Sequence, residues 1–401
     1  MKVLMLGWEL PPHNSGGLGV ACYQMCKELT KHGVSIEFIV PYTADHEIDF
    51  MKVTAATPQN VKDVIQSGIA YDSFKFIHDD GSEEWVSLFD QHRLYERGIE
   101  SIAKLAEFDV IHAHDWLTFR AGMRAKQISG KPLIVHIHAT EYDRAGGNSG
   151  NPMVEEIEYM AMMIADRIIT VSEHTKHVVI DHYGIPGDKI EVVHNSIDVG
   201  SYADPSADNL YTYLAAMKQY GWRIVSNIGR LTLQKGLVNL LLAMQGVIER
   251  APKTLLVFVG SGEQYEELIE KAAELGISRN VLFVDFQRGQ ALRDAFAVSD
   301  LFVMPSVSEP FGIAPLEAIA FGTPTLISKQ SGVAEVVRNC LKVDHWDIEE
   351  MINQITAVVQ NDVLRDELHE QSYLEFSRMN WYNAAHKLKN LYEISTAGVP
   401  L

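Results

Sequence analysis

Short runs of apolar residues are followed along the chain by segments in which apolar residues recur at helical spacing. This order predicts strands followed by helices. The clearest case surrounds residues 305–324. Four apolar residues at 301–304 predict a buried strand, and proline and glycine keep the next residues irregular. From Pro315 the apolar spacing becomes helical. Glu309 therefore lies in the loop before a helix, and Glu317 lies in its first turns.

The same pattern recurs from the first residues onward and predicts an α/β protein with mostly parallel strands. Strands are expected at 2–7, 35–42, 109–116, 132–140, 166–171, 223–228, 255–259, 280–286 and 301–304. The region 43–101 is less regular, with a strand-like run at 86–90. Residues 200–209 have linker composition, and a chain of 401 residues favours two domains.

Glycine-rich turns follow several of these strands and suit the binding of an anion. Gly17 and Gly19 follow the first strand, and Gly260 and Gly262 follow a later one. The segment GRLTLQKG at 229–236 carries Arg230 and Lys235, which can converge on one diphosphate. The alternative is a pair of surface cations that cap a helix.

Glu309 and Glu317 suit a different chemistry, because carboxylates accept hydrogen bonds from hydroxyls. A sugar and a ribose each offer several hydroxyls. The alternative is a solvated loop carboxylate together with a helical one that interacts with the helix dipole.

Histidines recur at the ends of two strands. His112 and His114 share one strand face, and so do His136 and His138. A zinc pair is one interpretation of His112 and His114, but a packed, hydrogen-bonded pair is favoured. Asp115 either lines an acceptor site or caps the next helix. For Cys22 and Cys26, core packing is favoured over metal binding.

Four segments together resemble the retaining glycosyltransferases of the two-domain GT-B fold, especially family 4 and the glycogen and starch synthases. These segments are GGLG at 16–19, HAHDW at 112–116, GRLTLQKG at 229–236 and the SEPFG…LEA…GTP frame that ends at Pro324. The resemblance covers nearly the whole chain. It implies two Rossmann-like domains facing each other across a cleft. Residues 1–198 would form the acceptor side, joined by a C-terminal helix at about 378–401, and 199–377 would bind the nucleotide sugar.

The resemblance also implies roles for individual residues. It makes His138, Arg230, Lys235 and Glu309 catalytic, and it puts acceptor contacts on Asp115 and Glu141. Donor contacts would come from Gly17, Gly19, Arg230, Lys235, Gly260, Gly262, Glu309, Phe311, Gly312, Ile313 and Glu317. No metal is required, because two cations replace it at the diphosphate. The family carries a lysine just before the first glycines, where this chain has Asn14 and Ser15.

The implied reaction is retaining transfer of a hexose from an NDP-sugar, such as ADP-glucose or UDP-glucose, to a hydroxyl of an α-glucan. Alternatives are a family 4 transferase with another sugar or acceptor and, more distantly, a nucleotide-sugar epimerase or sensor. A net charge of −19 disfavours nucleic acid and anionic membranes as partners. No apolar run predicts a membrane span. Three cysteines give no disulfide framework, so we expect a cytoplasmic protein.

Overall fold

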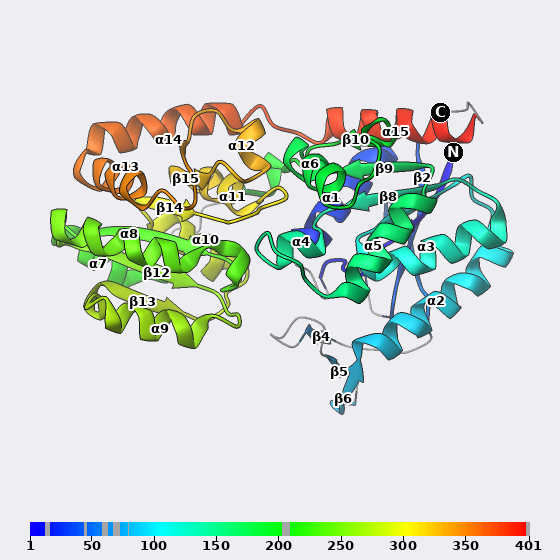
Figure 1. Ribbon diagram of the computed structural model, residues 1–401, viewed down its shortest axis with the longest axis horizontal. Helices are drawn as coiled ribbons and strands as arrows, with labels where there is room; N and C mark the ends of the chain where they lie inside the picture. The colour runs from blue at the N-terminus through cyan, green and yellow to red at the C-terminus, as the bar shows by residue number, and fades with distance from the viewer. Residues whose placement is uncertain are drawn as a thin grey trace. The chain divides into compact units, whose positions relative to one another are not determined.

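The computed structural model describes residues 1–12, 17–43, 46–57, 63–66, 73–78, 80–202 and 209–397. Two compact units make up the chain (Figure 1). The N-terminal unit contains Met1–Tyr142, Ser149–Ile197 and Asn380–Leu401, and the C-terminal unit contains Asp143–Asn148 and Asp198–Met379. Each unit has a parallel sheet with helices around it, so the expected α/β architecture of two domains is confirmed.

The sheet of the N-terminal unit has seven parallel strands in the order β10-β9-β8-β7-β1-β2-β3. Their bounds are β1 Lys2–Leu6, β2 Ser35–Val40, β3 Lys52–Ala55, β7 Val110–His114, β8 Leu133–Ile137, β9 Arg167–Thr170 and β10 Ile190–Val192. The strand order reverses between β1 and β7. A ligand-binding crevice is therefore expected at the carboxyl ends of these two strands, where the loops leave in opposite directions.

Helices pack on both faces of this sheet. They are α1 Gly17–Lys31, α2 Leu88–Leu105, α3 Trp116–Ser129, α5 Pro152–Ile164, α6 Glu173–Asp181 and α15 Tyr382–Thr396. The short helix α4 Glu141–Arg144 has its first two residues in this unit and its last two in the C-terminal unit. Helix α15, drawn in red in Figure 1, contacts α1 and β7 although it ends the chain. Ser172 is the N-cap of α6, because its side chain accepts a hydrogen bond from the Thr175 amide.

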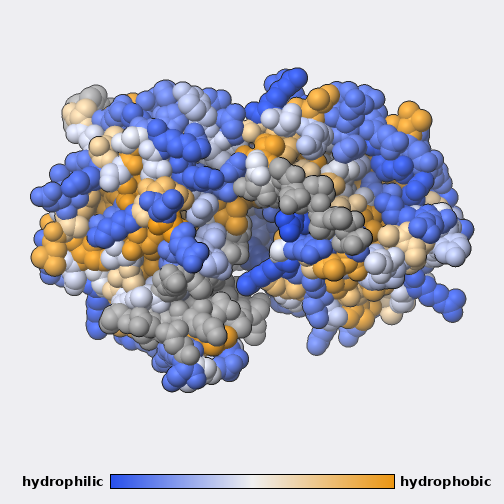
Figure 2. All heavy atoms as spheres, turned by 180° about the vertical axis from the view of Figure 1, so that it is seen from behind, coloured by the Kyte–Doolittle hydropathy of each residue, from blue (hydrophilic) through white to orange (hydrophobic). Residues whose placement is uncertain are grey.

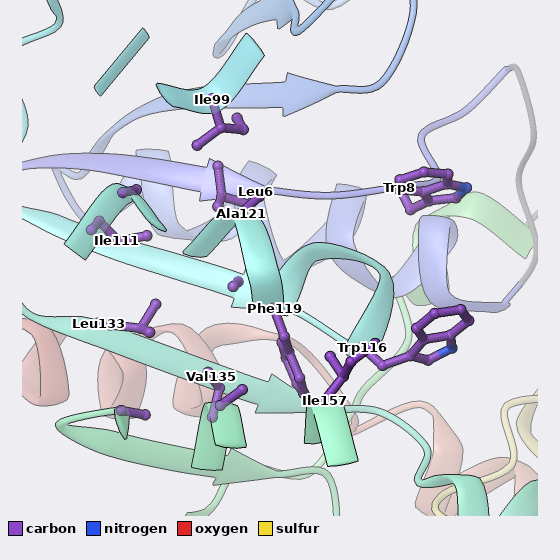
Figure 3. Packing of buried hydrophobic residues seen from close by; sticks show 14 of the residues in the cluster. Leu6, Trp8, Ile99, Ile111, Trp116, Phe119, Ala121, Leu133, Val135 and Ile157 are labelled. Atoms are coloured by element: carbon purple, nitrogen blue, oxygen red, sulfur yellow. The ribbon is translucent and has the colours of Figure 1, made fainter. Parts of the chain in front are cut away.

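One face of the N-terminal sheet is apolar (Figure 3). Leu6, Ile111 and Val135 come from β1, β7 and β8, and they pack against Phe119 of α3 and Ile157 of α5. Because side chains alternate along a strand, the residues between them point to the other face. That second face carries the histidines and lies under α1 and α15.

The region 43–101 differs from the sequence-based expectation. It contains a small antiparallel sheet of β4 Asp63–Gln66, β5 Ser73–Ile77 and β6 Glu83–Ser87. The strand predicted at 86–90 is wrong beyond Ser87, because α2 begins at Leu88. Leu88, Gln91, Tyr95 and Ile99 are all buried, and this helical spacing continues past the short apolar run that suggested a strand.

The C-terminal unit has a six-stranded parallel sheet in the order β13-β12-β11-β14-β15-β16. Its strands are β11 Arg223–Ile228, β12 Thr254–Val259, β13 Val281–Val284, β14 Leu301–Met304, β15 Thr325–Ser328 and β16 Leu341–Val343. Its helices include α7 Thr212–Gln219, α8 Leu237–Arg250, α9 Tyr265–Glu274, α10 Gly289–Val298, α11 Ala314–Ala320, α12 Val333–Val336, α13 Ile348–Gln360 and α14 Asp362–Phe376. The strand order reverses between β11 and β14, so a second crevice is expected at their carboxyl ends.

The surface in Figure 2 mixes hydrophilic and hydrophobic residues over both units. Among the described residues, no helix combines the length and the apolar character that crossing a membrane would require.

Candidate active site

Two loops of the C-terminal unit meet where its strand order reverses. One loop follows β11 and the other follows β14. The Val307 amide donates to the Gln234 carbonyl at 2.9 Å, and the Gln234 side chain donates to the Ser308 carbonyl at 2.9 Å. Gln234 is buried, so this two-way link is shielded from solvent. The link fixes the two loops against each other.

Lys235 and Glu309 lie on these two loops and form an ion pair. The Lys235 Nζ is 2.5 Å from Glu309 Oε2, and the Ser306 hydroxyl donates to the same oxygen at 3.0 Å. The two side chains are 17% and 10% exposed. Glu309 is therefore not a solvated loop carboxylate, which was one alternative from the sequence, and its charge is balanced by Lys235.

The loop around Glu309 is also anchored through its backbone. The Glu309 amide donates to the Gln330 carbonyl, and the Glu309 carbonyl accepts from the Gly332 amide, each at 2.9 Å. The Phe311 carbonyl accepts from the Val333 amide at 2.7 Å, and the Phe311 side chain is buried. The segment that holds the carboxylate is thus fastened to the loop after β15.

Gly312 is required by the local backbone. Its φ of +91° lies in the left-handed region, and a Cβ there would be 2.8 Å from Met304 Cε. Ile313 and Glu317 follow at the start of α11. Glu317 is half-buried in the first turn, where its carboxylate also interacts favourably with the helix dipole.

Arg230 differs from Lys235 in its surroundings. Its side chain is exposed, and no hydrogen bond or ion pair joins it to the described part of the chain. The structure thus leaves Arg230 available to an anion, whereas Lys235 is engaged by Glu309.

Gly260 and Gly262 contact the loop that carries Arg230. A Cβ at Gly260 would lie 1.9 Å from the Gly229 carbonyl oxygen, and one at Gly262 would lie 2.3 Å from that of Leu231. The Leu231 amide also donates to the Ser261 carbonyl at 2.9 Å. The close packing of these two loops explains why glycine is required at both positions. The contact of the two glycines with a donor stays a prediction.

In the N-terminal unit, the predicted residues follow β1, β7 and β8, which are neighbours in the sheet. Gly17 begins α1, and the Gly19 amide donates to Glu9 Oε2 at 3.3 Å. Asn14 and Ser15, where the family carries a lysine, lie outside the described residues.

Asp115 occupies the N-cap position of α3 with a positive φ of 56°, but its side chain makes no capping hydrogen bond to that helix. Its Oδ1 instead accepts from the backbone amides of His138 and Ala139, at 2.7 and 3.3 Å. Capping of α3 by the Asp115 side chain is therefore wrong, although the residue stands at the N-cap, and the carboxylate fixes the turn after β8.

Glu141 begins α4 and is buried. Its Oε1 accepts from the Asn151 amide at 2.8 Å, and its own amide donates to both carboxylate oxygens of Glu158 at 3.0 Å. Part of the hydrogen-bonding capacity of Glu141 is thus used within the N-terminal unit.

Four histidines form one packed cluster on the second face of this sheet. The rings of His112 and His114 are 4.3 Å apart, and His114 Nδ1 is 3.0 Å from His138 Nε2. The rings of His112 and His114 are therefore packed against each other, and each ring has a hydrogen-bond partner elsewhere, Tyr392 for His112 and His138 for His114. Burial lowers the pKa of His112 and of His138 to about 3, and it holds the pKa of His114 and His136 well below the usual value. All four rings are neutral near pH 7, so His138 can exchange hydrogen bonds but carries no charge.

Sequence reasoning missed several supporting residues. Ser306 stands three residues before Glu309, and Gln234 lies within GRLTLQKG, so the position of each relative to these motifs could have identified it. Tyr392 was not, because its hydroxyl contacts His112 Nδ1 at 2.7 Å across 280 positions of sequence.

Comparison with known proteins agrees with this architecture. The family described as Glycosyltransferase Family 4 matches residues 15–201, and Glycosyl transferases group 1 matches residues 218–375. An uncharacterized glycosyltransferase of Methanocaldococcus jannaschii is 28% identical over 98% of each chain. A glycogen synthase of Mycobacterium tuberculosis is 27% identical over 84% of this chain and 80% of that protein. A D-inositol 3-phosphate glycosyltransferase of Rhodococcus opacus is 25% identical over 96% of this chain and 86% of that protein.

Solved structures show the same fold. A sucrose-phosphate synthase of Thermosynechococcus elongatus has a TM-score of 0.74 at 18% identity and covers 99% of this chain and 100% of its own. Anabaena HepE in complex with UDP-glucose has a TM-score of 0.70 at 18% identity and covers 98% and 99%. With a family 4 domain followed by a group 1 domain on two parallel sheets, the chain belongs to the GT-B glycosyltransferases.

Proposed function

We propose that this glycosyltransferase is a retaining, metal-independent hexosyltransferase that moves glucose from ADP-glucose or UDP-glucose to a hydroxyl of an α-glucan. The observation that carries the proposal is the arrangement around Lys235. One loop presents an exposed Arg230 and a Lys235 that pairs with Glu309, at the point where the C-terminal sheet reverses its strand order. On two linked loops, the cations suit the diphosphate of a nucleotide sugar and the carboxylate suits the hydroxyls of its sugar.

In this mechanism Arg230 and Lys235 stabilise the negative charge that grows on the diphosphate as the bond to the sugar breaks. Two fixed cations provide preorganised electrostatic stabilisation, so no metal is needed at the phosphates. Gly17, Gly19, Gly260 and Gly262 let backbone approach the donor, as do Phe311, Gly312 and Ile313.

Glu309 holds donor-sugar hydroxyls and Glu317 holds the ribose, which orients the reacting carbon. Binding of the donor would require Lys235 to share its charge between Glu309 and a phosphate. The neutral His138 donates or accepts a hydrogen bond at a sugar hydroxyl, and Asp115 and Glu141 lie on the acceptor side. The leaving phosphate takes the proton of the attacking hydroxyl on the same face of the sugar, which gives retention.

A second candidate is transfer to an inositol phosphate or another small acceptor. It is supported by relatives named D-inositol 3-phosphate glycosyltransferase that align over nearly the whole chain.

The three cysteines are free thiols, in keeping with a reducing compartment such as the cytoplasm.

The test is a matrix of donors and acceptors. ADP-glucose, UDP-glucose and GDP-mannose are each incubated with a maltooligosaccharide or inositol 3-phosphate, with and without EDTA added at assay time, beside Arg230→Ala. EDTA-resistant glucosyl transfer to the maltooligosaccharide supports the proposal, and NMR of the fresh product gives the anomeric configuration. Glucosyl transfer only to inositol 3-phosphate supports the second candidate, and turnover only with GDP-mannose contradicts glucose as the transferred sugar. No turnover of any donor contradicts both and favours a sensor, whereas donor isomerisation without acceptor favours an epimerase.

A further inference from the structure

The histidine cluster of the N-terminal unit has an arrangement that packing alone does not explain. β7 and β8 are paired in register, with His114 opposite His136. Alternation then puts His112 on the same face as both of them. The three residues can each bring a ring nitrogen within 4.8 Å of the other two. Three potential ligands from two neighbouring strands therefore converge at one place under α1 and α15.

These rings are short of hydrogen-bond partners. Among the described residues, no partner is found for Nε2 of His112 or for either ring nitrogen of His136. The two side chains are 0% and 1% exposed. A neutral imidazole has one N–H donor and one lone pair, and buried polar groups are almost always satisfied. Something other than the described polypeptide is expected to complete this cluster.

We propose that His112, His114 and His136 bind one zinc ion. Neutral imidazole nitrogen is a preferred zinc ligand, and a site of nitrogen donors excludes magnesium and calcium, which require oxygen. Three histidines provide three of the four positions of a tetrahedral zinc site. Nitrogens around such an ion lie roughly 3.3 Å apart, so rings already within 4.8 Å need only small side-chain rotations to reach it.

The surroundings of His112 are those of an oriented metal ligand. Its Nδ1 is 2.7 Å from the Tyr392 hydroxyl, which fixes the ring and leaves Nε2 as the nitrogen for the metal. An ion at this position would join β7 to β8 and, through Tyr392, would strengthen the attachment of α15.

A competing set of ligands shares His114. Cys22, His114 and His138 also bring donor atoms within 4.8 Å of one another. In either set His114 would give up one contact, that of Nδ1 with His138 Nε2 at 3.0 Å or that of Nε2 with Met5 Sδ at 2.9 Å, whereas Nε2 of His138 is already bonded to His114. Nε2 of His112 and both ring nitrogens of His136, by contrast, have no partner among the described residues. The set of three histidines is therefore favoured.

This inference does not depend on the proposed transfer reaction. The zinc ligands belong to the N-terminal unit, whereas Arg230 and Lys235 belong to the C-terminal unit. A chain without any transferase activity would still bind zinc here, and a transferase without zinc would disprove only this inference.

The test measures metal in the full chain, purified without a polyhistidine tag. We expect about one zinc per chain by plasma mass spectrometry. After removal of the metal, zinc at about 100 times its Kd should raise the Tm of the N-terminal unit by roughly 5–10 °C. His136→Phe keeps a ring at the site but removes both nitrogens, and it should lose the bound zinc and the Tm response. Cys22→Ala is the matched control, and it should keep both.

Cobalt substitution gives a readout on the unmodified chain, so the test survives if His136→Phe does not fold. Tetrahedral cobalt absorption without a thiolate charge-transfer band supports the site of three histidines. Wild-type protein that neither contains zinc nor responds to it overturns the inference, as does zinc retained at full stoichiometry by a folded His136→Phe. Loss of the metal in Cys22→Ala, or a charge-transfer band with cobalt, overturns it in favour of the competing set.

Discussion

Lys235 and Glu309 are 74 positions apart in the chain, yet the lysine Nζ lies 2.5 Å from the carboxylate. A cation expected at the diphosphate and a carboxylate expected at the sugar are therefore joined before any donor is present. The pair preorganises both groups, because each holds the other in place at an exposure of less than one fifth. Disturbing one residue should consequently affect the other.

The pair should show energetic coupling. Lys235→Gln leaves the Glu309 charge without its cation, and Glu309→Gln leaves the lysine without its anion. Each change should lower transfer at least about 100-fold and destabilise the C-terminal unit by about 1–3 kcal/mol. In the double variant the loss of stability should be smaller than the sum of the two. Urea unfolding of the four proteins measures this, and additivity within about 0.5 kcal/mol would contradict a direct interaction.

Arg230→Ala should separate activity from stability. The side chain is exposed and contacts no partner in the described part of the chain, so its removal should change the free energy of unfolding by no more than about 0.5 kcal/mol. Transfer should fall about 10²- to 10³-fold, because one charge that stabilises the leaving diphosphate is lost. Arg250→Ala is the control, since Arg250 ends α8 and bonds to Glu349 and Asn353. Equal activity of the two variants would remove Arg230 from the mechanism.

Gly262→Ala should distort the loop that carries Arg230. The new Cβ would meet the Leu231 carbonyl oxygen at 2.3 Å, a backbone atom that cannot rotate away. We expect a cost of about 3 kcal/mol and a marked loss of transfer. Gly276→Ala is the comparison, because Gly276 has a φ of +72° and no atom within 4 Å of the added Cβ. It should cost about 1 kcal/mol through backbone strain alone and leave activity intact. If the two variants unfold at the same urea concentration, the loops are not packed as described.

His92 should make the N-terminal unit sensitive to acid. It is buried between Trp8 and Trp116, with ring centroids 6.2 and 5.8 Å away, and the positions of both tryptophans can be followed in Figure 3. Burial and the nearby Arg120 lower its pKa from 6.5 to about 4. Between those values the unfolded chain binds the proton and the folded chain does not, so stability is lost as the pH falls from 6.5 towards 4.

The size of this loss is roughly 3 kcal/mol, at about 1.4 kcal/mol for each pH unit. Chemical unfolding at pH 7, 5.5 and 4 should show a shallower decline for His92→Gln than for the unmodified protein. Parallel declines would mean that His92 is already accessible to protons in the folded chain.

The sequence predicted the strand–loop–helix unit around Glu309 well, because a buried strand, three prolines and a helical repeat all fall within about twenty residues. It predicted the β11 loop because a buried strand, a polar segment bounded by Gly229 and Gly236, and a helical repeat follow one another there. It failed at 86–90, where a run of only two or three apolar residues fits both a strand and the first turn of α2, and only the later spacing to Tyr95 and Ile99 decides.

Contacts between distant segments were beyond sequence reasoning. The role of Asp115 depends on the amides of His138 and Ala139, which the pairing of β7 with β8 brings next to it. The spacing within HAHDW could not distinguish this from a helix cap. The Lys235–Glu309 pair likewise requires β11 and β14 to be neighbours, although they are separated in the chain by β12 and β13.

Because α15 packs on the first sheet, the N-terminal unit cannot complete its folding until the last helix has been synthesised. A ribosome makes β1 to β10 long before Asn380–Leu401, and those last residues belong to the same compact unit. While the C-terminal unit is being translated, His112 lacks the Tyr392 hydroxyl, and the sheet face under α15 stays uncovered. A chain released before α15 is made would therefore contain the C-terminal unit but would lack the last helix of the N-terminal unit, although that unit is synthesised first.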